Sequence, residues 1–170
     1  MQQVSTQKVS FQSEELKVVG NLFKPENSQK DVSLPAILVA GAMTGVKEQA
    51  AGNYGEHIAK AGYMTLVLDH RHFGESEGIP RQHEDPAKKM EDFKNAVSFL
   101  CSLRGIDKQR IGACGISMGG GYMLQLSAFD RRVKAAAIVA SECIFPASEN
   151  KEIHNSRASV TQLPIYNDAM

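Results

Sequence analysis

The sequence lacks the features that mark nucleic-acid-binding and membrane proteins. Basic and acidic residues are balanced at 19 each, so neither a basic stripe for a nucleic acid nor an acidic tail is present. No apolar run approaches the roughly 18 residues of a membrane span. The polar start, MQQVSTQKVS, lacks the apolar core of a signal peptide. We therefore expect no nucleic-acid partner and no membrane association.

Cysteine is scarce, and metal-binding patterns are missing. Cys101, Cys114 and Cys143 are odd in number and lack metal-type spacing, which indicates a reduced, cytoplasmic setting. Cys114 lies at the end of a predicted strand and is interpreted as a small buried residue. His70 and His72 could form a metal pair if the strand before them continued, but no third ligand at a familiar spacing supports it. We expect no metal and no other cofactor.

The sequence does contain the alternation of strands and helices that is typical of an α/β fold. With 42% hydrophobic residues, the 170-residue chain can bury a core. Residues 8–11 and 16–23 flank a polar turn at 13–15 and predict an antiparallel hairpin at a sheet edge, with a half-buried second strand. The continuous apolar run LPAILVA, residues 34–40, is typical of a parallel strand buried on both faces.

Helices are predicted between the later strands. Residues 46–62 predict a helix whose apolar side is formed by Ala50, Tyr54, Ile58 and Ala61. The clearest helix covers residues 86–104, with Asp85 placed to cap it, Pro86 in its first turn and Gly105 at its end. The rest of the pattern is a helix at 118–128 and strands at 63–69, 110–114 and 133–140. This alternation implies right-handed crossovers and a largely parallel sheet.

The strongest chemical signal is Gly115-Ile116-Ser117-Met118-Gly119, which has the spacing of a serine nucleophile elbow. It lies between a predicted strand and a predicted helix, the context that gives this spacing its meaning. The turn needs strained dihedral angles and close backbone approach, so residues two positions from the serine must be small. Ser117 is therefore the candidate nucleophile. The alternative is a Gly/Ser-rich turn packed on the sheet.

Backbone donors for a developing oxyanion are expected from two places. One is the start of the helix after the serine, where free N–H groups and the helix dipole favour negative charge. The other is the loop GAMTGVKEQ, residues 41–49, whose glycines let the backbone approach a ligand. The candidate donors are the N–H groups of Met118 and Met43. The alternative for this loop is an ordinary strand-to-helix connection.

The segment LDHRHFGESEG, residues 68–78, is dense in polar side chains. We interpret Asp69 and Arg71 as residues that hold this loop together by charge and hydrogen bonding, while its glycines turn the chain.

Taken together and in their order along the chain, the motifs resemble those of the α/β-hydrolase superfamily. The resemblance is strongest to its dienelactone-hydrolase-like and X-Pro-dipeptidyl-peptidase-like members. The shared motifs are TGVKEQ at 44–49, GES at 74–76, EDPA at 84–87 and the elbow at 110–122. The resemblance spans about residues 9–141. It implies a mostly parallel sheet with an N-terminal antiparallel hairpin and flanking helices. It also implies a small-molecule substrate and ester, thioester or amide chemistry through an acyl-enzyme at Ser117, with Met43 and Met118 as donors.

The end of the chain departs from that family. The family places its acid and histidine on loops after later strands, whereas the predicted strands here end near Ala140. We therefore expect residues 1–145 to be the N-terminal portion of an α/β-hydrolase domain that lacks its last strands, followed by an irregular tail at 146–170. Glu142 and His154 stand in the right order to complete a triad, but His154 would have to fold back over the elbow. The second hypothesis is a catalytically inactive relative that binds a ligand or a partner.

The strand predicted at 133–140 is normally an interior strand in this family. With no later strand evident, its outer backbone groups would lack partners, and unpaired edges recruit other chains. Self-association through this edge is therefore expected, unless the tail covers it.

Overall fold

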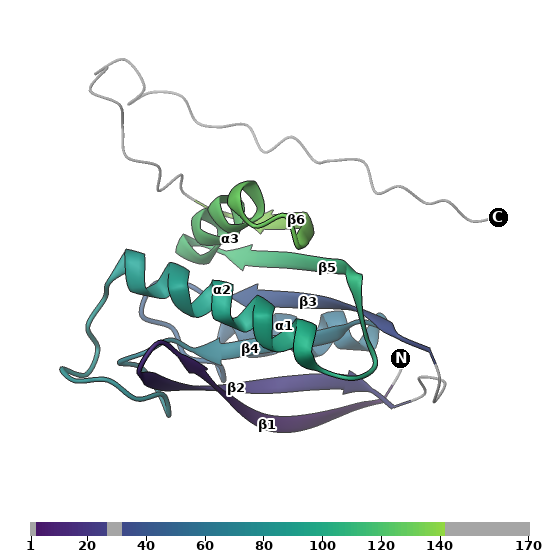
Figure 1. The fold of residues 1–170 in the computed structure, drawn as a ribbon, viewed down its shortest axis with the longest axis horizontal. Coiled ribbons are helices and arrows are strands. Elements are labelled where there is room, and N and C mark those ends of the chain that lie inside the picture. Colours follow the sequence, from purple (N-terminus) through teal and green to yellow (C-terminus); the bar gives the residue numbers. More distant parts are fainter. Residues whose placement is uncertain (1–2, 27–31, 142–170) are drawn as a thin grey trace, which may run out of the picture.

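The described residues, 3–26 and 32–141, form a mixed sheet with helices on both faces in the computed structural model (Figure 1). The strands are β1 (Val4–Ser13), β2 (Leu16–Pro25), β3 (Leu34–Ala40), β4 (Met64–Asp69), β5 (Ile106–Ile116) and β6 (Val133–Val139). Their order is β1-β2-β4-β3-β5-β6. The β1–β2 and β2–β4 pairs are antiparallel, and the other three pairs are parallel. The predicted α/β class, mostly parallel with an N-terminal hairpin, is confirmed.

The N-terminal hairpin turns tightly, and its second strand is buried more deeply than the sequence pattern predicts. Ser13 pairs with Leu16 across the turn, where Glu14 has a φ of 55°. On β2, Val18 faces the larger core cluster and Phe23 faces the smaller one on the other side of the sheet. The prediction of a half-buried second strand is therefore wrong. β2 lies between β1 and β4 in the sheet, and its side chains enter a core cluster on each face.

Helix α1, Ala50–Lys60, lies on one face of the sheet and packs on it through small residues. Its buried residues are Ala51, Gly55 and Ala59, whereas Tyr54 is 39% exposed. The predicted apolar side is therefore wrong, and the helix begins four residues later than predicted. The reason is close approach, because a Cβ at Gly55 would lie 2.8 Å from Cγ1 of Val67 on β4.

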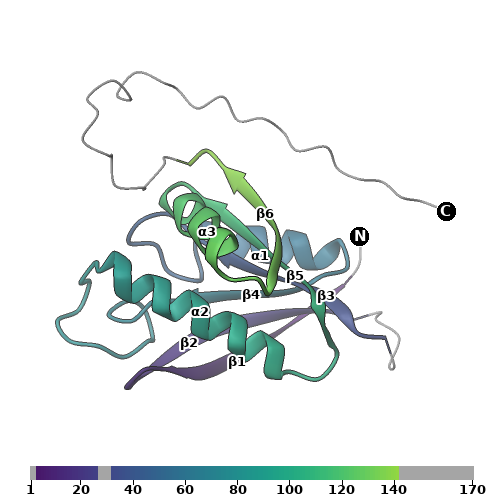
Figure 2. The same cartoon turned by 45° about the horizontal axis from the view of Figure 1, so that its top comes forward.

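Helices α2 (Pro86–Ser102) and α3 (Met118–Phe129) cover the opposite face (Figure 2). Asp85 caps α2 by accepting a hydrogen bond from the Lys88 N–H at 3.0 Å, as predicted. Phe93 and Val97 of α2 enter the larger core cluster. Within the described ranges, no helix is both long enough and apolar enough to cross a membrane. The parallel strands β3, β4 and β5 end at one edge of the sheet, and the loops that follow them meet there.

Candidate active site

Ser117 occupies a strained turn between β5 and α3. Its φ and ψ are 54° and −128°, a sparsely populated region for a residue with a side chain. It is the N-cap position of α3, yet its side chain forms no capping hydrogen bond. The residue is exposed, and its Oγ bonds to none of residues 3–26 and 32–141. The turn therefore presents an accessible hydroxyl at the positive end of a helix dipole.

The residues around this turn are glycines because backbone lies where a side chain would be. A Cβ at Gly115 would lie 2.3 Å from the Gly119 carbonyl oxygen. A Cβ at Gly119 would lie 2.4 Å from the Gly41 carbonyl oxygen. The elbow and the loop after β3 are thus in direct backbone contact. The predicted geometry, a tight strand-to-helix turn with small neighbours, is present.

The loop after β3 carries Met43 on a turn. The Gly45 N–H donates to the Ala42 carbonyl oxygen at 3.1 Å, and Thr44 has a φ of 60°. The Met43 side chain is 53% exposed. The Met43 N–H donates to no oxygen within the described ranges, and the Met118 N–H is the first of its helix, where no preceding turn supplies an acceptor. Both predicted donors are therefore available for a ligand.

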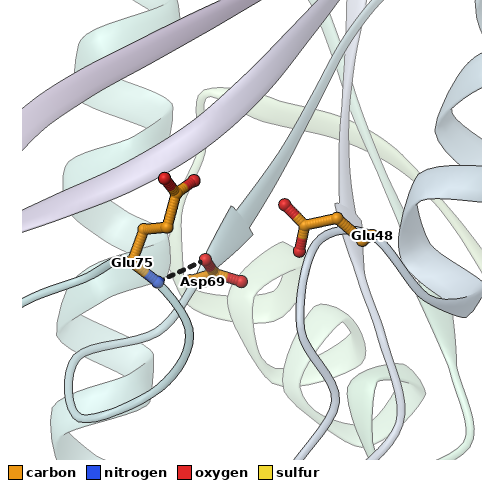
Figure 3. Close-up of side chains that lie close together, drawn as sticks. All are labelled: Glu48, Asp69 and Glu75. Atoms are coloured by element: carbon orange, nitrogen blue, oxygen red, sulfur yellow. Dashed lines mark hydrogen bonds between the residues drawn. The ribbon is translucent and has the colours of Figure 1, made fainter.

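Lys47 ties this loop to the end of β4. It is 1% exposed, and its Nζ lies 2.7 Å from a carboxylate oxygen of each of Glu48, Asp69 and Glu75. These three carboxylates converge, and Asp69 also accepts a hydrogen bond from the Glu75 N–H at 2.9 Å (Figure 3). The Lys47 backbone N–H also donates to Asp69, at 2.8 Å.

The charges of this Lys47 cluster stabilise one another. Burial alone would lower the pKa of Lys47, but its hydrogen bonds to Asp69, Glu48 and Glu75 outweigh burial and raise it. The hydrogen bond from Lys47 lowers the pKa of Glu75 to about 2, with a further contribution from Lys8. The carboxylate oxygens could hold a cation, and in this structure that cation is the ammonium group of Lys47. The interpretation of Asp69 as a residue that holds its loop together is confirmed.

Arg71 forms a second charged cluster behind the loop. It donates to the buried Asp92 from Nε, Nη2 and its backbone N–H, and to Glu14 at 2.6 Å. Ser13 Oγ also donates to Asp92 at 2.6 Å. Burial raises the pKa of Asp92, but its contacts with His70, Arg71 and Ser13 outweigh burial and lower it to about 2. These contacts join the loop after β4 to the hairpin turn and to α2, whereas the sequence predicts that Arg71 holds together its own loop.

The two histidines considered as a metal pair have different neighbours. The His70 ring packs edge-on against Phe93, with ring centroids 4.4 Å apart, and burial lowers its pKa. The His72 ring packs against His83 at 5.3 Å. The two histidine rings therefore pack against different partners, His70 against Phe93 and His72 against His83.

A cavity of about 530 Å³ opens beside the two candidate donors. Met43 and Met118 both line it, so the loop after β3 and the start of α3 border the same cavity. The first half of α2, including Met90, also lines it, as does Glu84, two residues before this helix. Ser117 itself is not among the lining residues. Glu84 belongs to the EDPA motif, but the sequence does not indicate that Glu84 or Met90 lines a cavity beside the elbow.

A general base for Ser117 is not found among the residues that the structure describes. The His57 ring bonds to the Asn53 carbonyl oxygen at 2.7 Å, and the other described histidines have the contacts given above. Glu142 and His154, the candidates for the acid and the base, lie outside the described residues, as does the predicted tail at 146–170. Cys114 is 5% exposed, and burial raises the pKa of its thiol, as expected for a structural cysteine.

The sequence matches the dienelactone hydrolase family over residues 19–168, which includes the elbow, the loop after β3 and the EDPA helix start. The chain belongs to the dienelactone hydrolase family. An uncharacterized protein of Pseudomonas aeruginosa, PA2218, is 39% identical over 133 residues, which are 78% of this chain and 36% of that protein. The quorum-quenching protein AidA of Acinetobacter baumannii is 36% identical and covers 81% and 43%. The thiohydrolase aneE of Aspergillus aculeatus is 38% identical and covers 75% and 38%.

Solved structures agree with the fold. The crystal structure of PA2218 from Pseudomonas aeruginosa superposes with a TM-score of 0.78 at 37% identity, over 82% of this chain and 43% of that one. A dienelactone hydrolase-like structure from Klebsiella pneumoniae shares the fold, with a TM-score of 0.69 at 20% identity and coverage of 87% and 64%. The chain thus has the α/β-hydrolase fold and spans less than half the length of the curated relatives named above.

Proposed function

We propose that this chain carries the nucleophile and the oxyanion hole of a serine hydrolase. Ser117 Oγ attacks the carbonyl carbon of an ester, thioester or amide, the leaving group departs, and water then hydrolyses the acyl-enzyme. The N–H groups of Met43 and Met118 donate to the tetrahedral oxyanion. The substrate is a small molecule that enters the cavity beside these two residues.

The observation that carries this proposal is the conformation of Ser117. A positive φ at a non-glycine residue costs about 1–3 kcal/mol and persists only where the surrounding structure maintains it. An N-cap serine normally bonds back to its own helix, whereas the Oγ of Ser117 is exposed and forms no capping bond. Such a turn suits a hydroxyl that must meet a ligand. Membership of the dienelactone hydrolase family and the thiohydrolase relative add support for a hydrolase.

The second candidate function is that of an inactive relative that binds a ligand or a partner. It is favoured by the absence of any hydrogen bond between Ser117 and a histidine among the described residues. Without a base, a serine hydroxyl is a weak nucleophile, and loss of one triad member leaves about 10³–10⁴-fold catalysis over water. We therefore expect the 170-residue chain to hydrolyse p-nitrophenyl acetate slowly.

Labelling with a fluorophosphonate separates the two functions. We expect one equivalent of label on Ser117, measured by mass spectrometry of the intact folded protein and of its peptides. Ser117→Ala should abolish labelling. Ser127→Ala is the matched control, because Ser127 lies on the same helix with its Oγ bonded to the Leu124 carbonyl oxygen. Absence of label on the folded wild-type chain would favour the binding function.

Efficient turnover of p-nitrophenyl acetate that His154→Ala abolishes would assign the base to His154.

A further inference from the structure

The cavity beside Met43 and Met118 has the size of a ligand site, and its mixed lining includes an adaptable apolar part. Its volume, about 530 Å³, lies within the range of small-molecule sites. Three methionines face it from three elements: Met43 from the loop after β3, Met90 from α2 and Met118 from α3. Methionine side chains are flexible and polarizable, so they adapt to apolar chains of varied shape. Pro86 and Ala87 extend this apolar wall along α2.

The charged groups that line the cavity are already paired. Glu84 lies 2.7 Å from the Nζ of Lys89, whose side chain is 4% exposed. Glu91 lies 2.8 Å from the Nζ of Lys94, and this pair is about half exposed at the cavity rim. Lys94 is the single cation among the described lining residues, and Glu91 competes for it with a negatively charged substrate group. A carboxylate placed in the cavity would lose hydration without gaining an unshared partner.

The uncharged polar groups that line the cavity also provide no positive charge for a substrate carboxylate. Burial, together with the charges of Glu84 and Asp85, raises the pKa of Tyr122 to about 12, so its hydroxyl stays protonated at neutral pH. Gln125 is neutral. The cavity thus offers neutral hydrogen-bonding groups, and the two carboxylates that line it, Glu84 and Glu91, outnumber its one described lysine, Lys94.

We propose that this cavity binds the acyl part of the substrate and selects a neutral, aliphatic acyl chain of medium length over one that ends in a carboxylate. As a statement about the substrate class, the inference rests on the proposed hydrolase function. Binding to the cavity itself can be measured without any turnover.

Methionine methyl NMR tests the proposal, because the reporters are part of the site. The intact chain, labelled with ¹³C at the methionine methyl groups, is titrated with octanamide and with suberic acid monoamide, which has a similar length but ends in a carboxylate. Single Met→Leu variants assign the signals. We expect octanamide to shift the signals of Met43, Met90 and Met118. Met64 and Met123, which are 5% and 0% exposed, should not move.

The two probes should differ in affinity. We expect the carboxylate probe to bind at least about 10-fold more weakly than octanamide, because its charge finds no free cation. Glu91→Gln frees Lys94 and should narrow this difference by about 2–5-fold, the value of a half-exposed ion pair. Glu56→Gln is the matched control, because Glu56 forms a similar ion pair with Lys60 on α1, away from the cavity. That variant should leave the difference unchanged.

Several results would overturn the inference. They are equal or tighter binding of the carboxylate probe, no saturable shift of the three cavity methionines, or equal effects of Glu91→Gln and Glu56→Gln. Failure of the hydrolase function looks different, because octanamide would still bind while the fluorophosphonate left Ser117 unlabelled. Labelling of Ser117 without octanamide binding would instead refute this inference alone.

Discussion

Replacement of Lys47 tests whether its buried ion pairs hold the loop that carries Met43. Lys47→Met keeps most of the side-chain length but removes the ammonium group 2.7 Å from Asp69, which is 0% exposed. Breaking a buried pair from one side typically costs about 3–5 kcal/mol. Two backbone N–H donors to Asp69 remain, and the other two carboxylates reach solvent. We therefore expect a loss of about 3 kcal/mol in the free energy of unfolding.

Urea denaturation followed by circular dichroism measures this loss within a double-mutant cycle. Asp69→Asn alone should also destabilise the protein, because it leaves Lys47 buried with weaker partners. The double variant should cost at least about 1–2 kcal/mol less than the sum of the two single changes, because the partners interact directly. Lys60→Met is the control, since Lys60 pairs with Glu56 at 2.6 Å on the surface and should cost less than about 1 kcal/mol. A loss below about 1 kcal/mol for Lys47→Met, or strict additivity, would refute this account.

Three further predictions concern packing, pH and the sheet edge. Gly119→Ala should cost about 1–3 kcal/mol in urea unfolding and reduce fluorophosphonate labelling, because its Cβ would lie 2.4 Å from the Gly41 carbonyl oxygen; unchanged labelling would contradict that contact. The pKa of Asp92 is lowered to about 2, so its roughly 2 kcal/mol of stability is present above about pH 4 and lost as the pH falls towards 2. The stability gap between wild type and Asp92→Asn should therefore close over that range, and a constant gap would disprove the linkage. At the sheet edge, we expect fast hydrogen exchange along Val133–Val139 in a dilute monomer. We also expect concentration-dependent association in ultracentrifugation, whereas strong protection in a monodisperse monomer would show that the edge is covered.

The sequence predicts the parts of this fold that follow from backbone rules. Strand β3 has the predicted bounds, because a continuous apolar run suits a strand covered on both faces. The cap and start of α2 follow from Asp85 and Pro86. The turn at Ser117 could be predicted because only glycine fits at the positions two residues before and two residues after it, Gly115 and Gly119. In each case the local sequence and the final packing require the same residue type.

The parts that could not be predicted depend on tertiary contacts. Helix α1 buries Ala51 and Gly55 instead of its larger apolar residues, because the sheet approaches too closely for a bulky side chain. The burial of Lys47 and Lys89 is equally hidden, since lysine is normally exposed and only the converging carboxylates make its burial tolerable. The EDPA motif supplies Pro86 and Ala87 to the cavity wall on α2, but the sequence does not show that they face α3, because this depends on how α2 and α3 pack.

The turn at Ser117 is held in part by the edge strand β6, so the order of this strand affects the position of the candidate nucleophile. The Ser117 N–H donates to the Val139 carbonyl oxygen at 3.0 Å, so the last residue of β6 helps to hold the strained turn. A Cβ at Gly120 would lie 2.4 Å from Cβ of Ser141, so the chain just after β6 also packs against the start of α3. In the described sheet, β6 pairs on one side only, with β5. Whatever covers or loosens the other side of β6 therefore acts on the position of Ser117. For this reason, the rate of fluorophosphonate labelling should rise and fall with hydrogen-exchange protection of β6, because both depend on the order of the same strand end.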